Sequence, residues 1–220
     1  MLEVKVFLIV ASGCIVGSVY NKIRCSYMQQ LLSGIDDCLS KKNWFGALFI
    51  AISLPDICGA TEDKIKGNGA RYKDWFNRYL KPRYNADNMY DYLSLTSPAM
   101  VQSMPEGIKQ SLRAQKPVVS FTAEDCWSLR NACLHEGVDE TKLRKFKITT
   151  PARENLHAHM NAFNGVLQLD VIELCNDIAN GVRRWLVDMQ ENPEVMEKLT
   201  KMMTIDSLIF DGFIEYKTAK

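Results

Sequence analysis

The chain has 220 residues, 47% of them apolar, and a formal net charge of +1. This length and composition predict one domain with a substantial hydrophobic core. A charge so close to zero excludes the broad electrostatic footprint of a strongly basic nucleic-acid-binding protein, so RNA would have to be held by a local basic patch. The seven cysteines include no CxxC pair. They indicate free thiols in a reducing compartment, and we expect a cytoplasmic protein.

Cofactor motifs are missing from the sequence. It contains no glycine-rich phosphate loop, no dinucleotide fingerprint and no internal repeat. Cys126, Cys133 and His135 could offer metal ligands, but no fourth ligand has suitable spacing. We therefore predict neither a metal nor a cofactor.

The first 27 residues form an apolar extension. Val4 to Tyr20 is too short, and too interrupted by Gly and Ser, for a typical transmembrane helix, and Glu3 beside Lys5 is unlike a secretory signal. We expect a dispensable extension over residues 1–27, followed by a single helical domain over residues 28–220. An extra strand or helix, or an N-terminal membrane anchor, is the alternative.

Two helices are predicted at the start of the domain. The first is amphipathic and runs from Met28 to about Lys41, because apolar residues recur there at helical spacing. Asn43 should cap a second helix that is apolar nearly all round and hence central, and Pro55 should kink or end it. Asp56 follows this apolar run and must find a partner or reach a cavity. We expect it to cap the segment after Pro55.

An aromatic stripe and a long insertion follow. The stripe has helical spacing and should pack in the core; it comprises Tyr72, Trp75, Phe76 and Tyr79. Lys73 and Arg78 beside it are candidate RNA phosphate contacts. Residues 84–119 show little periodicity, which predicts an irregular surface insertion with one short helix near Glu106 to Ala114. A lid over a substrate is the alternative role.

A small β-hairpin is expected within residues 142–169. Lys142 to Thr150 alternates basic with apolar residues, and Ala162 to Leu169 should pair with it across Asn164 and Gly165 or a longer loop. The basic run could track an RNA backbone or simply blunt an exposed strand edge; its candidate RNA-binding residues are Lys142, Arg144 and Lys145. After the hairpin, Asp170 should cap a long helix, and Asn192 and Pro193 should open another that runs to about Met203.

The segment from Thr122 to Gly137 carries the candidate chemistry. Thr122 with Asp125 predicts a capped helix start, and Gly137 suits a left-handed helix end. Asn131 and His135 are four residues apart and share a helix face, toward which the long side chain of Arg130 can turn. A histidine can take a proton from a ribose 2′-hydroxyl, and an arginine can stabilise charge on a phosphoryl group.

The spacing of Arg130, Asn131, three residues and His135 resembles the motif of the HEPN superfamily. The blocks ALFIAISLPDICGA, YKDWFNRYL and DCWSLRNACLHEG also resemble uncharacterised bacterial proteins related to HEPN domains. The resemblance implies a mainly α, HEPN-like helical bundle. It also implies a metal-independent endoribonuclease of a toxin-antitoxin or phage-defence system, in which Arg130 and His135 are catalytic and Asn131 orients them.

The resemblance further implies a homodimer whose two motifs form one composite site, RNA as substrate, and an antitoxin or defence protein as a possible partner. The alternative is a catalytically inactive HEPN-like module that binds RNA, a nucleotide or a protein. A second match, Arg153 with His159, follows Pro151 without helix caps, and we expect it to be a chance occurrence. Even Arg130 and His135 could be a surface pair favoured by a helix C-terminus.

Overall fold

The computed structural model describes residues 27–62, 66–151 and 158–205. The expected extension over residues 1–27 therefore lies outside the described residues, except for Tyr27, which begins the first helix. The protein is mainly helical with one small sheet, as predicted. Its helical body consists of α2 (Tyr27–Ser40), α3 (Trp44–Glu62), α4 (Asn68–Tyr79), α9 (Ala123–Asn131), η1 (Ala132–Glu136), α10 (Val171–Asp188) and α11 (Pro193–Thr200).

Helix α3 lies at the centre of the body, where it contacts α2, α4, α10 and α11. It continues through Pro55 to Glu62, so of the two expected outcomes, a kink or an end, Pro55 does not end the helix. Packing on several sides compensates for the one hydrogen bond that a proline removes. The hydroxyl of Tyr72 on α4 donates to the carbonyl of Ile52 at 3.2 Å and joins the two helices. Among the described residues, α3 alone is long and apolar enough to cross a membrane, but half of that stretch is buried in the body.

The aromatic stripe packs in the core as predicted. Tyr72, Trp75, Phe76 and Tyr79 are all buried on one face of α4. The predicted cap of α10 is also present, because the carboxylate of Asp170 accepts hydrogen bonds from the backbone N–H groups of Ile172 at 2.9 Å and Glu173 at 3.1 Å. Both helices pack against α3.

A three-stranded sheet stands where a single hairpin was expected. Its strands are β1 (Lys145–Thr149), β2 (Asn161–Phe163) and β3 (Val166–Asp170), in the order β1-β3-β2. The hairpin joins β2 to β3 through Asn164 and Gly165, which both have positive φ, 49° and 77°. Strand β1 pairs with β3 in parallel, so the predicted direct hairpin between these two segments is wrong. The connection from β1 to β3 contains β2 and is long enough for the two strands to run in the same direction.

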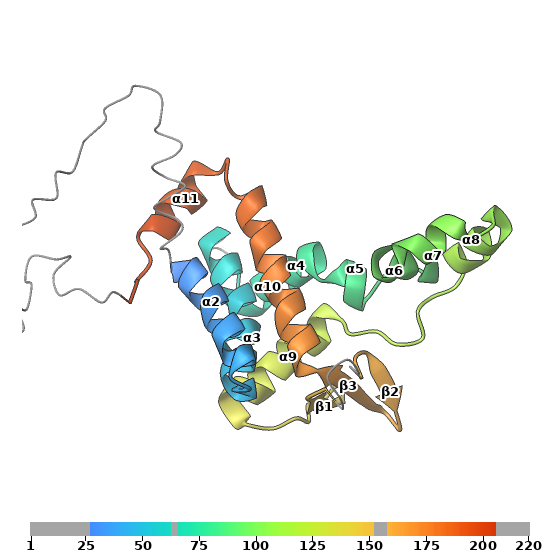
Figure 1. Cartoon of the computed structure of the whole chain (residues 1–220). Coiled ribbons are helices and arrows are strands. Elements are labelled where there is room, and N and C mark those ends of the chain that lie inside the picture. The colour runs from blue at the N-terminus through green and yellow to red at the C-terminus, as the bar shows by residue number, and fades with distance from the viewer. Residues whose placement is uncertain (1–26, 63–65, 152–157, 206–220) are drawn as a thin grey trace, which may run out of the picture.

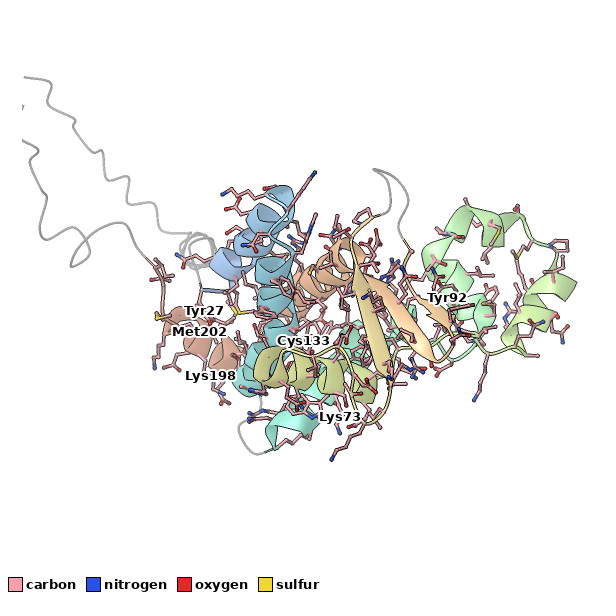
Figure 2. All side chains as sticks on the ribbon, turned by 90° about the horizontal axis from the view of Figure 1, so that it is seen from below. Tyr27, Lys73, Tyr92, Cys133, Lys198 and Met202 are labelled. Atoms are coloured by element: carbon pink, nitrogen blue, oxygen red, sulfur yellow. The ribbon has the colours of Figure 1, made fainter. Side chains whose placement is uncertain are left out.

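The insertion is helical and forms an arm. Helix α5 (Lys81–Tyr84) stays against the body, where Tyr84 is buried, and the short helices α6 (Met89–Thr96), α7 (Pro98–Ser103) and α8 (Glu106–Arg113) project beyond it. Only α8 was predicted, so the expectation of an otherwise irregular segment is wrong. Helix α6 buries no residue and α7 buries Val101 alone, so neither has the apolar stripe that would reveal it in sequence. Figure 2 shows this arm, with Tyr92 labelled in it, standing apart from the body.

Candidate active site

The motif helix begins with the predicted capping box. The hydroxyl of Thr122 accepts from the backbone N–H of Asp125 at 3.1 Å, and the carboxylate of Asp125 accepts from the backbone N–H of Thr122 at 2.9 Å. At the other end Gly137 has φ 68°, the left-handed conformation that favours glycine. The sequence-based expectation of a helix closed at both ends is confirmed.

The last turn of this helix is a π-turn, which the sequence did not indicate. Residues Ala132–Glu136 form η1, and the N–H of Gly137 bonds to the carbonyl of Ala132, five residues earlier. In a regular α-helix Arg130 and His135 would point about 140° apart. A π-turn holds more residues per turn and brings positions five apart closer together. This turn explains how the two side chains meet at the spacing of the motif.

Arg130 contacts the other three residues of the candidate site. Its Nη1 lies 2.9 Å from Oδ1 of Asn131 and 2.8 Å from Nε2 of His135, and its Nη2 lies 2.6 Å from Oδ2 of Asp56. Its Nε is buried with no hydrogen-bond acceptor among the described residues. The structure therefore brings together all three residues predicted for catalysis, and it adds the carboxylate of Asp56.

The contact with Arg130 orients His135. A guanidinium can only donate hydrogen bonds, so Nε2 of His135 is the acceptor in this contact. The rest of the side chain is exposed to solvent.

Asp56 is the member of the site that sequence reasoning misassigned. It lies inside α3 and caps no following segment, because the helix continues. Burial raises the pKa of its carboxyl, and the guanidinium of Arg130 partly opposes this effect. The signal for its role was a carboxylate next to an apolar run, which needs a cationic partner, but the sequence did not identify that partner.

Packing against α4 fixes the motif helix. The ring of Trp127 lies 5.3 Å from that of Tyr72 and has the guanidinium of Arg130 5.3 Å from its centre. The sulfur of Cys126 is 3.3 Å from the hydroxyl of Tyr72. Burial raises the pKa of the Cys126 thiol to about 12, so this cysteine is an inert packing group.

Four of the five basic residues predicted to bind RNA bond to other groups of the protein. Lys73, labelled in Figure 2, pairs with Glu124 at 2.7 Å, and Arg78 pairs with Glu62 at 2.8 Å. Arg144 donates to the carbonyl of Ser120 at 2.7 Å, Lys145 pairs with Glu140 at 3.0 Å, and Lys142 is exposed. Among the described residues, no hydrogen bond or ion pair connects any of the five to the Arg130 cluster.

The second motif-like match has a different environment. Arg153 lies outside the described residues. Nε2 of His159 is 3.1 Å from the hydroxyl of Tyr84, and its Nδ1 accepts from the backbone N–H of Asp170 at 3.1 Å. Both ring nitrogens are thus occupied by groups of the fold, as expected for a structural histidine.

No protein family, curated protein or solved structure matches this chain. The resemblance to the HEPN superfamily therefore depends on the motif and the sequence blocks alone, and membership stays a prediction.

Proposed function

We propose that the protein is a metal-independent endoribonuclease of HEPN type. The observation that carries this proposal is the contact of 2.8 Å between the guanidinium of Arg130 and Nε2 of an exposed His135. A base that can accept a proton lies beside a cation that can bind a phosphate, and this pair is a minimal set for cleavage assisted by the 2′-hydroxyl.

Substrate binding would reorganise this pair. A phosphate of RNA competes for the guanidinium, because charge-assisted bonds to phosphate are stronger than a bond to a neutral imidazole. As Nη1 of Arg130 turns to the phosphate, Nε2 of His135 becomes available. It then takes the proton of the 2′-hydroxyl, the 2′-oxygen attacks phosphorus, and the bond to the 5′-oxygen breaks.

The leaving 5′-oxygen needs a proton, and the exposed His135 of the second motif in a homodimer would deliver one that it has taken up from solvent. The products are a 2′,3′-cyclic phosphate and a 5′-hydroxyl, so each proton removed is matched by a proton delivered. DNA has no 2′-hydroxyl and is spared.

Asp56 would act as a positioning residue. Its carboxylate holds Nη2 of Arg130 at 2.6 Å from the side of α3. This contact anchors one end of the guanidinium while Nη1 moves between His135 and the phosphate. Asn131 holds the same Nη1 group from the adjacent position on the helix.

The test is cleavage of single-stranded RNA by the full chain in EDTA, with DNA of the same sequence as control. Arg130→Ala and His135→Ala should abolish cleavage, whereas His159→Gln is the matched histidine control and should retain it. Circular dichroism and gel filtration report whether each variant keeps its fold and oligomeric state. Cleavage that persists in both motif variants, or that also consumes DNA, contradicts the proposal.

A second candidate is a catalytically inactive HEPN-like module that binds RNA, a nucleotide or a protein. It is favoured by the occupied Nε2 of His135 and by the ion pairs that hold Lys73 and Arg78. In that case the folded protein binds RNA or a partner without cleaving it, and a phosphate analogue does not release His135 from Arg130. Histidine resonances observed by NMR during phosphate titration distinguish the two candidates.

The resemblance also supports a biological setting. We propose a cytoplasmic toxin-antitoxin or phage-defence role, with an antitoxin or defence protein as partner. The genes beside this one provide a direct check of that setting.

A further inference from the structure

A cavity of about 510 Å³ borders the motif helix, whose Cys133 and Gly137 line it. One wall comes from the start of α3, and the opposite wall comes from η1, the segment after it and strand β1. The lining residues used below are Phe45, Phe49, Cys133, Asp139, Thr149 and Thr150. Cys133, labelled in Figure 2, lies on the part of the motif helix that faces this cavity. A cavity of this size accommodates a small organic group such as a nucleobase.

Two aromatic rings are left open on the α3 wall. Phe45 is 74% exposed and Phe49 is 41% exposed. Their ring centroids are 6.0 Å apart in an edge-to-face arrangement, so one ring face stays available for stacking. Exposed aromatic rings beside a cavity are stabilised when a flat apolar group covers them.

The opposite wall is mixed, and it adds a carboxylate and two hydroxyl groups to apolar side chains. The carboxylate of Asp139 lies close enough to Cys133 to add to the effect of burial, and together they raise the pKa of that thiol to about 11. Thr149 and Thr150 add hydroxyl groups. A carboxylate accepts hydrogen bonds from amino groups, as aspartate and glutamate do with the amino group of cytosine. A flat ring with a donor edge therefore fits between the two walls.

The cavity and the Arg130 cluster share two elements, α3 and the motif helix. Phe45, Phe49 and Asp56 are spaced four and seven residues apart, so they lie along one side of α3, and Asp56 binds Arg130. At the helical rise, Phe49 is about 10 Å from Asp56 along the axis. On the other wall, Cys133 and Gly137 line the cavity, and His135 belongs to the same turn, η1. A base in the cavity and a phosphate at Arg130 would thus contact the same two elements.

We propose that this cavity is a subsite for one unstacked base of single-stranded RNA that carries an amino group. The base stacks on Phe45 and Phe49, and its amino group donates to Asp139. Stacking on an aromatic side chain is the common way in which proteins hold single-stranded bases. This inference rests on the proposed function for its substrate, and it adds a base preference to a site that otherwise contacts only the backbone.

The experiment separates binding from cleavage. Fluorescent single-stranded RNA with 2′-fluoro sugars, which cannot be cleaved by the proposed mechanism, is titrated with the full chain. Phe45→Ala should weaken binding by roughly tenfold, given the usual contribution of a stacked base. The matched control is Phe163→Ala on β2, because Phe163 is 78% exposed and does not line the cavity. It should bind like the unmodified chain.

Asp139→Asn tests the base preference. The unmodified chain should bind oligonucleotides with adenine, cytosine or guanine at the preferred position more tightly than those with uracil, and the variant should lose this difference. Binding that depends on Phe45 in a protein without cleavage supports the subsite and contradicts the nuclease. Cleavage with binding unaffected by Phe45→Ala contradicts the subsite alone. A change in oligomeric state in Phe45→Ala would show that a second copy covers the rings, and it overturns the proposal.

Discussion

Two half-buried arginine–aspartate pairs, each with a histidine nearby, occur among the described residues. On α3 and the motif helix, Asp56 pairs with Arg130, which contacts His135. On α5 and α10, Arg83 pairs with Asp177, which accepts a hydrogen bond from Tyr84 at 2.8 Å, and the hydroxyl of Tyr84 lies 3.1 Å from Nε2 of His159. The chemical groups are the same, yet we assign catalysis to one cluster and structure to the other.

The carboxyl groups do not distinguish the clusters. Burial raises the pKa of Asp56 and of Asp177, and an arginine partly opposes the rise in each case. The histidines do distinguish them. Both nitrogens of His159 bond to groups of the fold, whereas His135 is exposed and has Nε2 bonded to a guanidinium that a phosphate could attract. A perturbed carboxyl is thus weaker evidence of function than the availability of the base beside it.

The largest expected difference is between the two histidines. His135→Ala should reduce RNA cleavage by on the order of 100- to 10,000-fold, the usual contribution of a general base. His159→Gln should keep the cleavage rate per folded molecule but lower the free energy of unfolding by about 1–3 kcal/mol, because it disturbs buried hydrogen bonds. Cleavage assays combined with urea unfolding measure both. Equal loss of cleavage in the two variants would remove the distinction between the clusters.

The two aspartates provide the next comparison. Asp56→Asn should slow cleavage by roughly 10- to 100-fold, because a small displacement of Arg130 from its catalytic position is costly. Asp177→Asn should leave cleavage unchanged. The readout that separates positioning from simple loss of fold is kcat against KM: Asp56→Asn should lower kcat, and Asp56→Glu should restore part of it. If Asp177→Asn slows cleavage as much, Asp56 has no special role.

Two glycines with a left-handed backbone test whether the end of η1 positions His135. Gly137 and Gly165 both have positive φ, 68° and 77°, and at each an added Cβ would meet no atom within 4 Å. Alanine at either position should therefore lower the free energy of unfolding by a similar amount, about 1 kcal/mol, from backbone strain alone. Only Gly137→Ala, which strains the end of η1, should also slow cleavage. Equal cleavage by the two variants would mean that this helix end does not position His135.

The smallest expected effect is on stability as a function of pH. The folded-state pKa values of Asp56 and Asp177 are raised above the usual 3.8, so the folded chain binds these protons more tightly than the unfolded chain. Their contribution to stability is complete below the unfolded-state value and is lost as pH rises through the folded-state value. Asp56→Asn and Asp177→Asn should each remove part of this pH dependence. Urea unfolding across the acidic range checks the sign, and stability that rises with pH in the unmodified chain but not in the variants would contradict it.

Much of the body follows from local sequence rules. Thr122, Asp170 and Asn192 cap the helices that they were expected to cap, because a short polar side chain before an apolar run has few other uses. Pro55 was expected to kink or end its helix, and tertiary packing on several sides of α3 lets the helix continue through it. The arm helices α6 and α7 were missed because they have eight and six residues and bury at most one of them, too few to show a helical period.

Long-range pairings set the limit of prediction for the sheet and the site. Alternation in β1 indicated a strand but could not tell a parallel from an antiparallel partner. The motif named Arg130, Asn131 and His135, and the structure does bring them into contact. The partnership of Asp56 with Arg130 joins positions far apart in the sequence. Local sequence patterns cannot identify such a pair. They show only that a partly buried carboxylate needs a cationic partner somewhere in the fold.

The π-turn of η1 also relates the spacing of the motif to the type of helix. A π-turn is equivalent to one extra residue inserted into an α-helix. The separation of five residues between Arg130 and His135 therefore suits a π-turn. Deleting one residue within Ala132–Glu136 would return the turn to α-helical geometry, in which a separation of four already places two side chains on one face. Related chains with one residue fewer between their arginine and histidine could thus preserve the same contact without any π-turn.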